Sequence, residues 1–90
     1  MPARSEWDVG MNEASELRRR AARWRATAEV TRTEMRTLRT LATLTWRGES
    51  AGAFREVLGR RVRELGELAD REDAVADLLD RVAAVVEQAA

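Results

Sequence analysis

Hydrophobic residues recur along the chain at alternating spacings of three and four positions, which is the period of one face of a long α-helix. In the first half, this row runs through Ala14, Leu17, Ala21, Trp24, Ala28, Thr31, Met35, Leu38, Ala42 and Thr45. In the second half, it runs through Ala51, Phe54, Leu58, Arg61, Leu65, Leu68, Glu72, Val75, Leu79, Val82, Val86 and Ala89. The pattern predicts two long helices, each with an apolar seam that Arg61 and Glu72 interrupt in the second.

The two rows are separated by one short break at Gly48. Glycine suits the left-handed backbone position just after a helix, and the hydroxyl of Ser50 can cap the helix that follows. We therefore predict an all-α fold, in which a single domain over 1–90 forms an antiparallel two-helix hairpin. Its expected parts are a flexible arm over about 1–10, a helix over about 11–46, a turn at 47–50 and a helix over about 50–88.

Composition limits the chemistry, because the chain contains no Cys, His or Tyr and its formal net charge is zero. The absence of Cys and His excludes disulfides and the metal sites that those residues form. Asp70, Asp73, Asp77 and Asp80 recur at helical spacing, and we interpret them as a solvated face. We predict no enzymatic activity, no cofactor and no metal site.

The arginine run at 18–25 contains Trp24, a combination that can bind phosphates and stack on bases. On a helix, however, Trp24 falls on the apolar seam and not among the arginines. We therefore predict no nucleic-acid partner. No segment approaches the roughly 18 apolar residues of a membrane span, so we also predict no membrane insertion, and the N-terminus lacks the apolar core of a Sec-type signal peptide.

Four arginines at a spacing of seven flank the first seam: Arg18, Arg25, Arg32 and Arg39. A hairpin folded about residue 47 would set them near Ala76, Ala69, Val62 and Arg55, none of which is acidic. Two interpretations stay open. The guanidinium groups extend into water over the alanines, or they select a partner by pairing with acids on another chain.

The apolar set of the second helix is wider than one neighbouring helix can cover, since it also includes Val62, Ala69 and Ala76 on one side and Leu78 and Val85 on the other. We therefore predict that the hairpin dimerises into a four-helix bundle with itself or with a second hairpin. The expected partner interface consists of Trp24, Met35, Leu38, Leu65, Leu68, Val75, Leu79, Val82 and Val86.

The break itself carries a turn motif, in which Trp46 and Gly48 are followed by the small Ala51 and the aromatic Phe54. A hairpin of this length with Trp-x-Gly between its helices resembles the WXG family of type VII (ESX) secretion. The resemblance implies a small protein that folds in the bacterial cytoplasm as a dimer, is recognised by a membrane secretion ATPase, and is then secreted or displayed at the cell surface by a non-Sec route.

The sequence departs from the family in one respect. Members that carry the export signal end the second helix with Tyr-x-x-x-Asp or Tyr-x-x-x-Glu, and this chain has no Tyr. The resemblance then implies that a partner supplies the signal, or that the chain is a subunit that stays in the cell. The alternative function is a cytosolic helical adaptor or antitoxin-like chaperone that is not exported.

Overall fold

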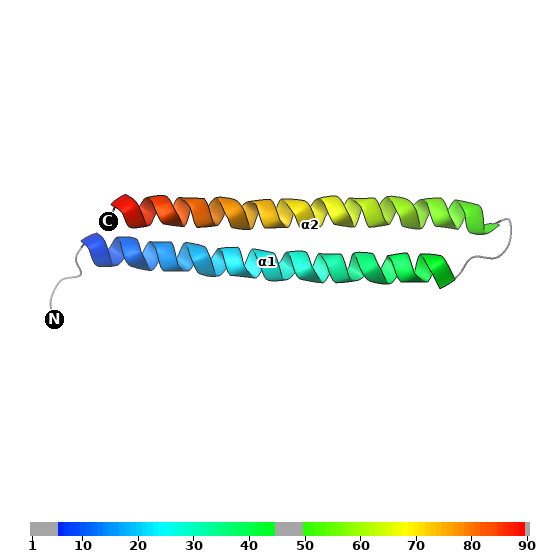
Figure 1. The fold of residues 1–90 in the computed structure, drawn as a ribbon, viewed down its shortest axis with the longest axis horizontal. Helices are drawn as coiled ribbons and strands as arrows, with labels where there is room; N and C mark the ends of the chain where they lie inside the picture. The colour runs from blue at the N-terminus through cyan, green and yellow to red at the C-terminus, as the bar shows by residue number, and fades with distance from the viewer. Residues whose placement is uncertain (1–5, 45–49, 90) are drawn as a thin grey trace.

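The chain folds into two antiparallel helices that lie side by side in one layer (Figure 1). The computed structural model describes the backbone of residues 6–44 and 50–89 and the side chains of residues 10–44 and 51–89. Helix α1 spans Glu6–Leu44 (39 residues) and α2 spans Ser50–Ala89 (40 residues). This confirms the predicted all-α hairpin. The turn residues Trp46 and Gly48 lie outside the described residues, so the predictions about them are untested.

Helix α1 begins earlier than the sequence pattern indicated. It starts at Glu6, whereas a flexible arm was expected up to about residue 10. Gly10 therefore lies within the helix. A glycine at an interior helix position costs about 1 kcal/mol relative to alanine, and the long run of good helix formers that follows can offset this cost. The other boundaries differ from the expected ones by one or two residues.

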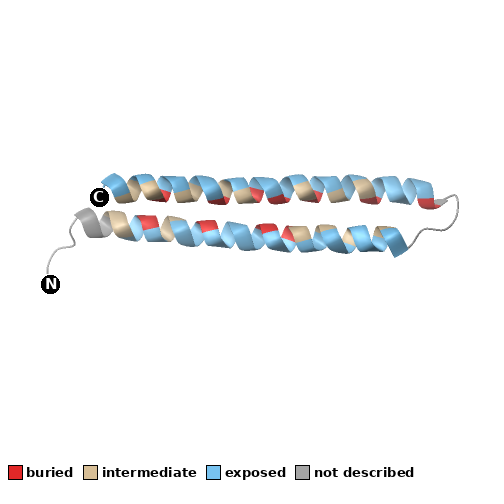
Figure 2. Cartoon of the chain, in the orientation of Figure 1, coloured by how far each residue is buried: buried red, intermediate tan, exposed pale blue. Residues whose placement is uncertain are grey.

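The interface between the helices is lined mainly by alanine, and the buried residues of the two helices face each other across it (Figure 2). The buried apolar residues are Ala14, Ala21 and Ala28 in α1 and Ala51, Leu58, Leu65, Ala69, Ala76 and Ala83 in α2. Small side chains let the two backbones approach closely. They also supply little apolar area, and no large side chain among the described residues is fully buried.

The seam predicted for α1 is confirmed at Ala14, Ala21, Ala28 and Thr31, which are all buried. The prediction is wrong at Trp24, which was placed on the seam but is 39% exposed. The seam predicted for α2 is only half correct. The seam consists of two rows of residues at a spacing of seven. The row through Ala51, Leu58, Leu65 and Glu72 is buried as expected, but the second row that faces α1 is not the expected one. Phe54, Arg61, Leu68 and Val82 are exposed, and the neighbouring row of Val62, Ala69, Ala76 and Ala83 faces α1 instead. The larger residues thus lie outside the hairpin interface.

The register of the hairpin also differs from the prediction. If the chain folded symmetrically about residue 47, Thr31 would lie opposite residue 63. Instead the Thr31 hydroxyl contacts Glu72, and Met35 lies against Gly66. The helices are therefore displaced along each other by about two turns. Figure 1 shows the consequence at the connection, where the start of α2 extends beyond the end of α1.

The molecule is a flat rod with extents of 73 × 21 × 11 Å and a radius of gyration of 20.6 Å. A compact domain of this length would have a radius of gyration of about 12 Å. Both helices consequently present most of their surface outward. Among the described residues, no helix is both long and apolar enough to cross a membrane.

Candidate protein-interaction surface

Helix α2 carries two rows of side chains that point in nearly opposite directions. Successive residues of an α-helix are rotated by about 100°, so residues seven apart stay on one side. Asp70, Asp73, Asp77 and Asp80 share one side, which we call the charged side. The other, which we call the apolar side, consists of Phe54, Val57, Leu68, Val75, Leu78, Val82 and Val85.

On the charged side, three arginines of α1 bridge to acids of α2. Arg18 donates from Nε and Nη2 to the Glu87 carboxylate, with both distances at 2.9 Å. Arg25 reaches Asp80 at 2.7 Å and Asp77 at 3.0 Å.

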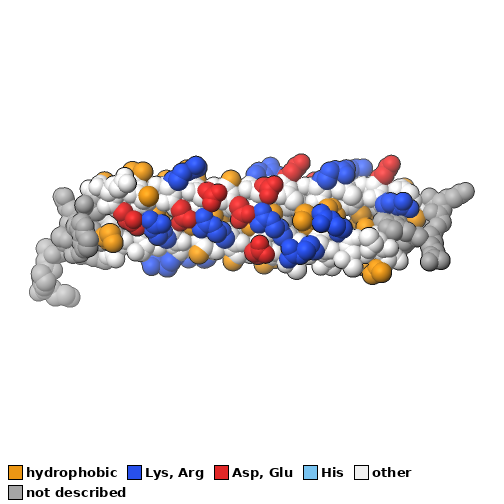
Figure 3. Space-filling view, viewed as in Figure 1, with side chains coloured by type: hydrophobic (Ala, Val, Ile, Leu, Met, Phe, Trp, Pro, Cys, Tyr) orange, Lys and Arg blue, Asp and Glu red, His pale blue; other side chains and the backbone are white. Residues whose placement is uncertain are grey.

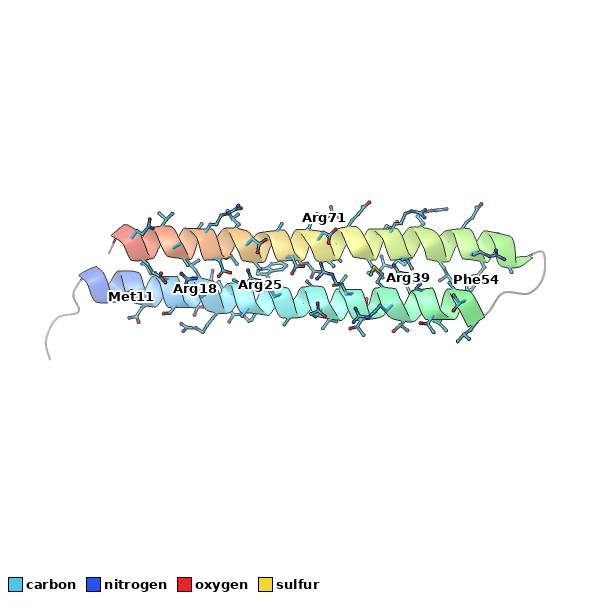
Figure 4. All side chains as sticks on the ribbon, in the orientation of Figure 1. Met11, Arg18, Arg25, Arg39, Phe54 and Arg71 are labelled. Atoms are coloured by element: carbon cyan, nitrogen blue, oxygen red, sulfur yellow. The ribbon has the colours of Figure 1, made fainter. Side chains whose placement is uncertain are left out.

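Arg32 completes the row, with Asp73 at 2.6 Å and Asp70 at 3.2 Å. Figure 3 shows these blue and red side chains interleaved along the line where the helices meet, and in Figure 4 Arg18 and Arg25 extend from α1 toward α2.

These contacts shift the protonation equilibria in the expected directions. The hydrogen bonds from Arg18, with a smaller contribution from its charge, hold the pKa of the Glu87 carboxyl below its usual range. The same bonds raise the pKa of Arg18, and the bonds that Arg25 donates to Asp80 and Asp77 raise the pKa of Arg25. The pair of Arg18 and Glu87 therefore favours the form in which both groups are charged.

The inference that the arginine row has no counter-charge within its own hairpin is therefore wrong. It failed because it assumed the register centred on residue 47. In the observed register, Arg18, Arg25 and Arg32 lie beside the acidic half of α2. Arg39 lies nearer the connection and makes no ion pair among the described residues. A partner-selecting role for the row no longer follows from unmatched charge.

The apolar side of α2 is exposed along most of its length. Phe54 is 50% exposed, Val82 41% and Val85 63%, and Val57, Leu68 and Leu78 are exposed as well. Its middle is polar, because Arg61, Glu64 and Arg71 occupy the same row. Arg61 pairs with Glu64 at 3.5 Å, while Arg71 lies at the edge of α2 that is turned away from α1 (Figure 4). The surface thus has two apolar ends and a charged centre.

Helix α1 contributes to the same side of the hairpin. Its exposed Trp24 lines a shallow depression together with Arg20, Arg23 and Thr27. Nearer the middle, a groove between the helices is lined by Glu34 and Leu38 of α1 together with Arg61 and Leu65 of α2. On α1, this side of the hairpin therefore combines Trp24 and Leu38 with charged and polar residues.

The residues predicted to form a partner interface fall into three groups in the structure. Leu65 is only 3% exposed and belongs to the contact between α1 and α2. Trp24, Leu68 and Val82 are exposed, and the remaining five are half-buried: Met35, Leu38, Val75, Leu79 and Val86. The structure contains one chain, so contact of these residues with a partner stays a prediction.

One polar pair is buried in the centre of the hairpin, which sequence reasoning treated only as two defects of the seam. Glu72 is 6% exposed and Thr31 is 7% exposed. The Thr31 hydroxyl donates to the Glu72 carboxylate at 2.7 Å and is also within hydrogen-bonding distance of the Thr27 carbonyl. The sequence signal was available, since Thr31 and Glu72 are polar residues within the two predicted seams.

Two further patterns of the chain concern the acidic residues and the glycines in its described part. No group of three or more acidic side chains there could hold a metal ion, and Asp70, Asp73, Asp77 and Asp80 are each within ion-pair distance of an arginine. Gly52, Gly59 and Gly66 recur every seven residues in α2, and of these three only Gly66 lies against the other helix, where an added Cβ would be 3.4 Å from the Met35 sulfur.

Comparisons with protein-family models, with curated proteins and with solved structures give no match to this chain. The described residues define a two-helix hairpin with one charge-paired side and one apolar side. Such an arrangement can bind another helical surface.

Proposed function

We propose that the chain is a non-enzymatic protein-interaction module that packs the apolar side of its hairpin on a second hairpin to form a four-helix bundle. The observation that supports this proposal is the exposure of apolar residues at both ends of that side of α2, with Phe54 and Val57 at one end and Leu78, Val82 and Val85 at the other. Monomeric soluble proteins rarely expose a continuous apolar patch larger than a few hundred Å². A second pair of helices would cover these residues and add the apolar burial that the alanine-lined seam lacks.

We further propose that the module acts in type VII secretion, as a small exported protein or as the bundle partner of one. This part rests on the resemblance to the WXG family, because Trp46 and Gly48 fall in the interval 45–49 between α1 and α2, with Ala51 and Phe54 in the first turns of α2. Since the chain has no Tyr, a different protein that travels with it would supply the export signal recognised by the secretion ATPase.

The test of the secretion role is fractionation of cells with and without a working secretion ATPase. We expect the chain in the medium or at the cell surface only when the ATPase is functional. Retention in the cytoplasm under both conditions, together with a stable complex inside the cell, would instead favour the adaptor or chaperone-like alternative.

The test of the binding surface is Val82→Asp, with Ala22→Asp as the matched control. Val82 lies on the apolar side of α2, whereas Ala22 is an exposed residue on the other side of α1. A charge at Val82 would have to be desolvated in the bundle, so we expect association to weaken at least tenfold while helicity is retained. Sedimentation and circular dichroism measure the two quantities, and equal effects of both variants on association would contradict the proposal.

A further inference from the structure

The charged centre of the apolar side is complementary to the same residues of a second, antiparallel copy of the chain. Glu64 and Arg71 lie in one row, seven residues apart, with Leu68 between them. If a second α2 packs antiparallel with a two-fold axis near Leu68, Glu64 of each copy faces Arg71 of the other. Two ion pairs then form, one on each side of the axis.

The apolar residues follow the same symmetry. The register that pairs Glu64 with Arg71 sets Leu68 against its own copy, Val57 against Leu78 and Phe54 against Val82, and each of these residues is exposed in the hairpin. Another register would align the two ends of α2, with Ser50 on Ala89. That arrangement would place Arg71 on Leu68 and Glu64 on Val75, so the two charges would face apolar residues instead of each other, which is costly.

Helix α1 is compatible with this axis. Thr31 lies opposite Glu72, and Met35 lies opposite Gly66, so Leu68 is level with residues 33–34 of its own α1. An antiparallel pairing of the two α1 helices about that point sets Trp24 toward Leu44 of the second copy, and both side chains are exposed.

The same pairing brings Glu34 close to its own copy at the axis. Arg61 lines the same groove as Glu34 and supplies a positive charge there.

We infer that the partner of the apolar side is a second copy of this chain, bound antiparallel with the axis at Leu68 and with Glu64–Arg71 pairs between the copies. The inference rests on the proposed function, because it assumes that the apolar side binds a hairpin. The ion pairs on the charged side also favour self-association. Arg18, Arg25 and Arg32 have their counter-charges within the chain and require none from a different protein.

The inference is tested with two full-length variants, Glu64→Arg and Arg71→Glu, studied separately and mixed. In a symmetric dimer, each variant alone replaces two attractions by two repulsions, so we expect self-association about tenfold weaker than that of the parent chain, and weaker still at low salt. In the mixture, arginine at 64 meets glutamate at 71, and glutamate at 64 meets arginine at 71. A heterodimer as stable as the parent dimer should form.

Matched controls are Glu56→Arg and Arg63→Glu, which change the same residue types at the same spacing on the charged side of α2. We expect these two variants to self-associate like the parent and to gain nothing on mixing. Circular dichroism reports whether each chain keeps its helicity. Recovery on mixing shows that a variant failed through its interface and not through its folding.

The outcomes separate the inference from the proposed function. If the parent chain dimerises, but Glu64→Arg and Arg71→Glu weaken self-association no more than the control variants do, the inferred register is wrong. A parent that stays monomeric at micromolar concentration, but binds a different hairpin in a manner sensitive to Val82→Asp, overturns self-association and leaves the proposed function intact. A parent that binds no hairpin overturns both.

Discussion

At the scale of single residues, the contact between Thr31 and Glu72 fixes how the two helices align. A carboxylate that is 6% exposed needs a hydrogen-bond donor, and in the described structure the Thr31 hydroxyl is the donor at 2.7 Å. Sliding one helix by a turn would leave the carboxylate against apolar side chains without that donor. The pair therefore contributes to the uniqueness of the register more than to the stability of the hairpin.

Thr31→Val should destabilise the hairpin by about 1 to 3 kcal/mol, because it removes the donor and leaves a buried acceptor unsatisfied. Thr33→Val is the control, since the exposed Thr33 hydroxyl bonds only the Glu29 carbonyl and the Arg36 guanidinium. Its effect should stay within about 0.5 kcal/mol. Chemical denaturation of both variants measures the difference.

Adding Glu72→Leu to Thr31→Val should return the stability to near the parent value or above it, because both members of the pair are then apolar. A double variant as unstable as Thr31→Val alone would show that the loss came from packing around residue 31 and not from the unsatisfied carboxylate.

At the scale of the helices, the row of ion pairs couples the two elements along one side of the hairpin. Arg18, Arg25 and Arg32 each contact acids that are 38 or more residues away in the sequence. All three are partly exposed, so each contributes little and is screened by salt. Their joint effect is to favour the antiparallel register in which the basic half of the chain lies beside the acidic half.

The pKa of Glu87 leads to a pH dependence of known sign. Because Arg18 lowers the pKa in the folded state, the contribution of the pair is fully present above the unfolded pKa of about 4.3 and is lost as the pH falls through the lower, folded pKa. The melting temperature should therefore fall on acidification below about pH 5, and less so in Arg18→Gln.

Arg36→Gln is the control for this measurement, since the Arg36 guanidinium bonds the Thr33 hydroxyl and not an acid. Its melting temperature should follow the acid dependence of the parent. If Arg18→Gln follows the parent equally closely in thermal melts between pH 3 and 7, the ion pair has no role in acid stability.

The sequence was sufficient to predict the two helices and the small buried residues of the α1 seam, because they recur at helical period. It did not predict that Trp24 of the same seam is exposed. It was not sufficient for α2, which has three adjacent rows of apolar residues. Size suggested that Phe54, Leu68 and Val82 were core, yet Ala69, Ala76 and Ala83 face α1. Alanine rows on both helices permit a close approach that larger residues would prevent, and this mutual fit is not visible in either helix alone.

The candidate surface was predictable to a similar extent. The excess apolar width of α2 correctly indicated an uncovered side. Which residues pair with Arg18, Arg25 and Arg32, in contrast, depended on the register of the two helices. That register is set by contacts such as Thr31 with Glu72, between residues 41 positions apart, and local patterns carry no information about such pairs.

At the scale of the whole molecule, the hairpin is long and thin, so the way it associates determines its overall dimensions. Pairing through the apolar sides about an axis near Leu68 adds mass across the short axis of the rod. The ends of the two copies then overlap incompletely, because the axis does not pass through the middle of the hairpin. Association at the tips would instead nearly double the length.

Small-angle scattering should therefore give a dimer with a longest dimension about 15 Å greater than the 73 Å of the single hairpin. The same sample diluted to the monomer should approach the radius of gyration of 20.6 Å. A dimer about twice as long as the monomer would rule out pairing through the apolar sides.

The alanine-lined seam also bears on how long each molecule persists in a cell. A hairpin whose described core contains no fully buried large side chain has little to hold its helices together, so a solitary copy would open often and be cleaved by proteases. Binding only the folded form shifts this balance by mass action. If the apolar side is covered as proposed, newly made chains that find a partner survive and surplus chains are removed, so degradation would adjust the amount of protein to the amount of its complex.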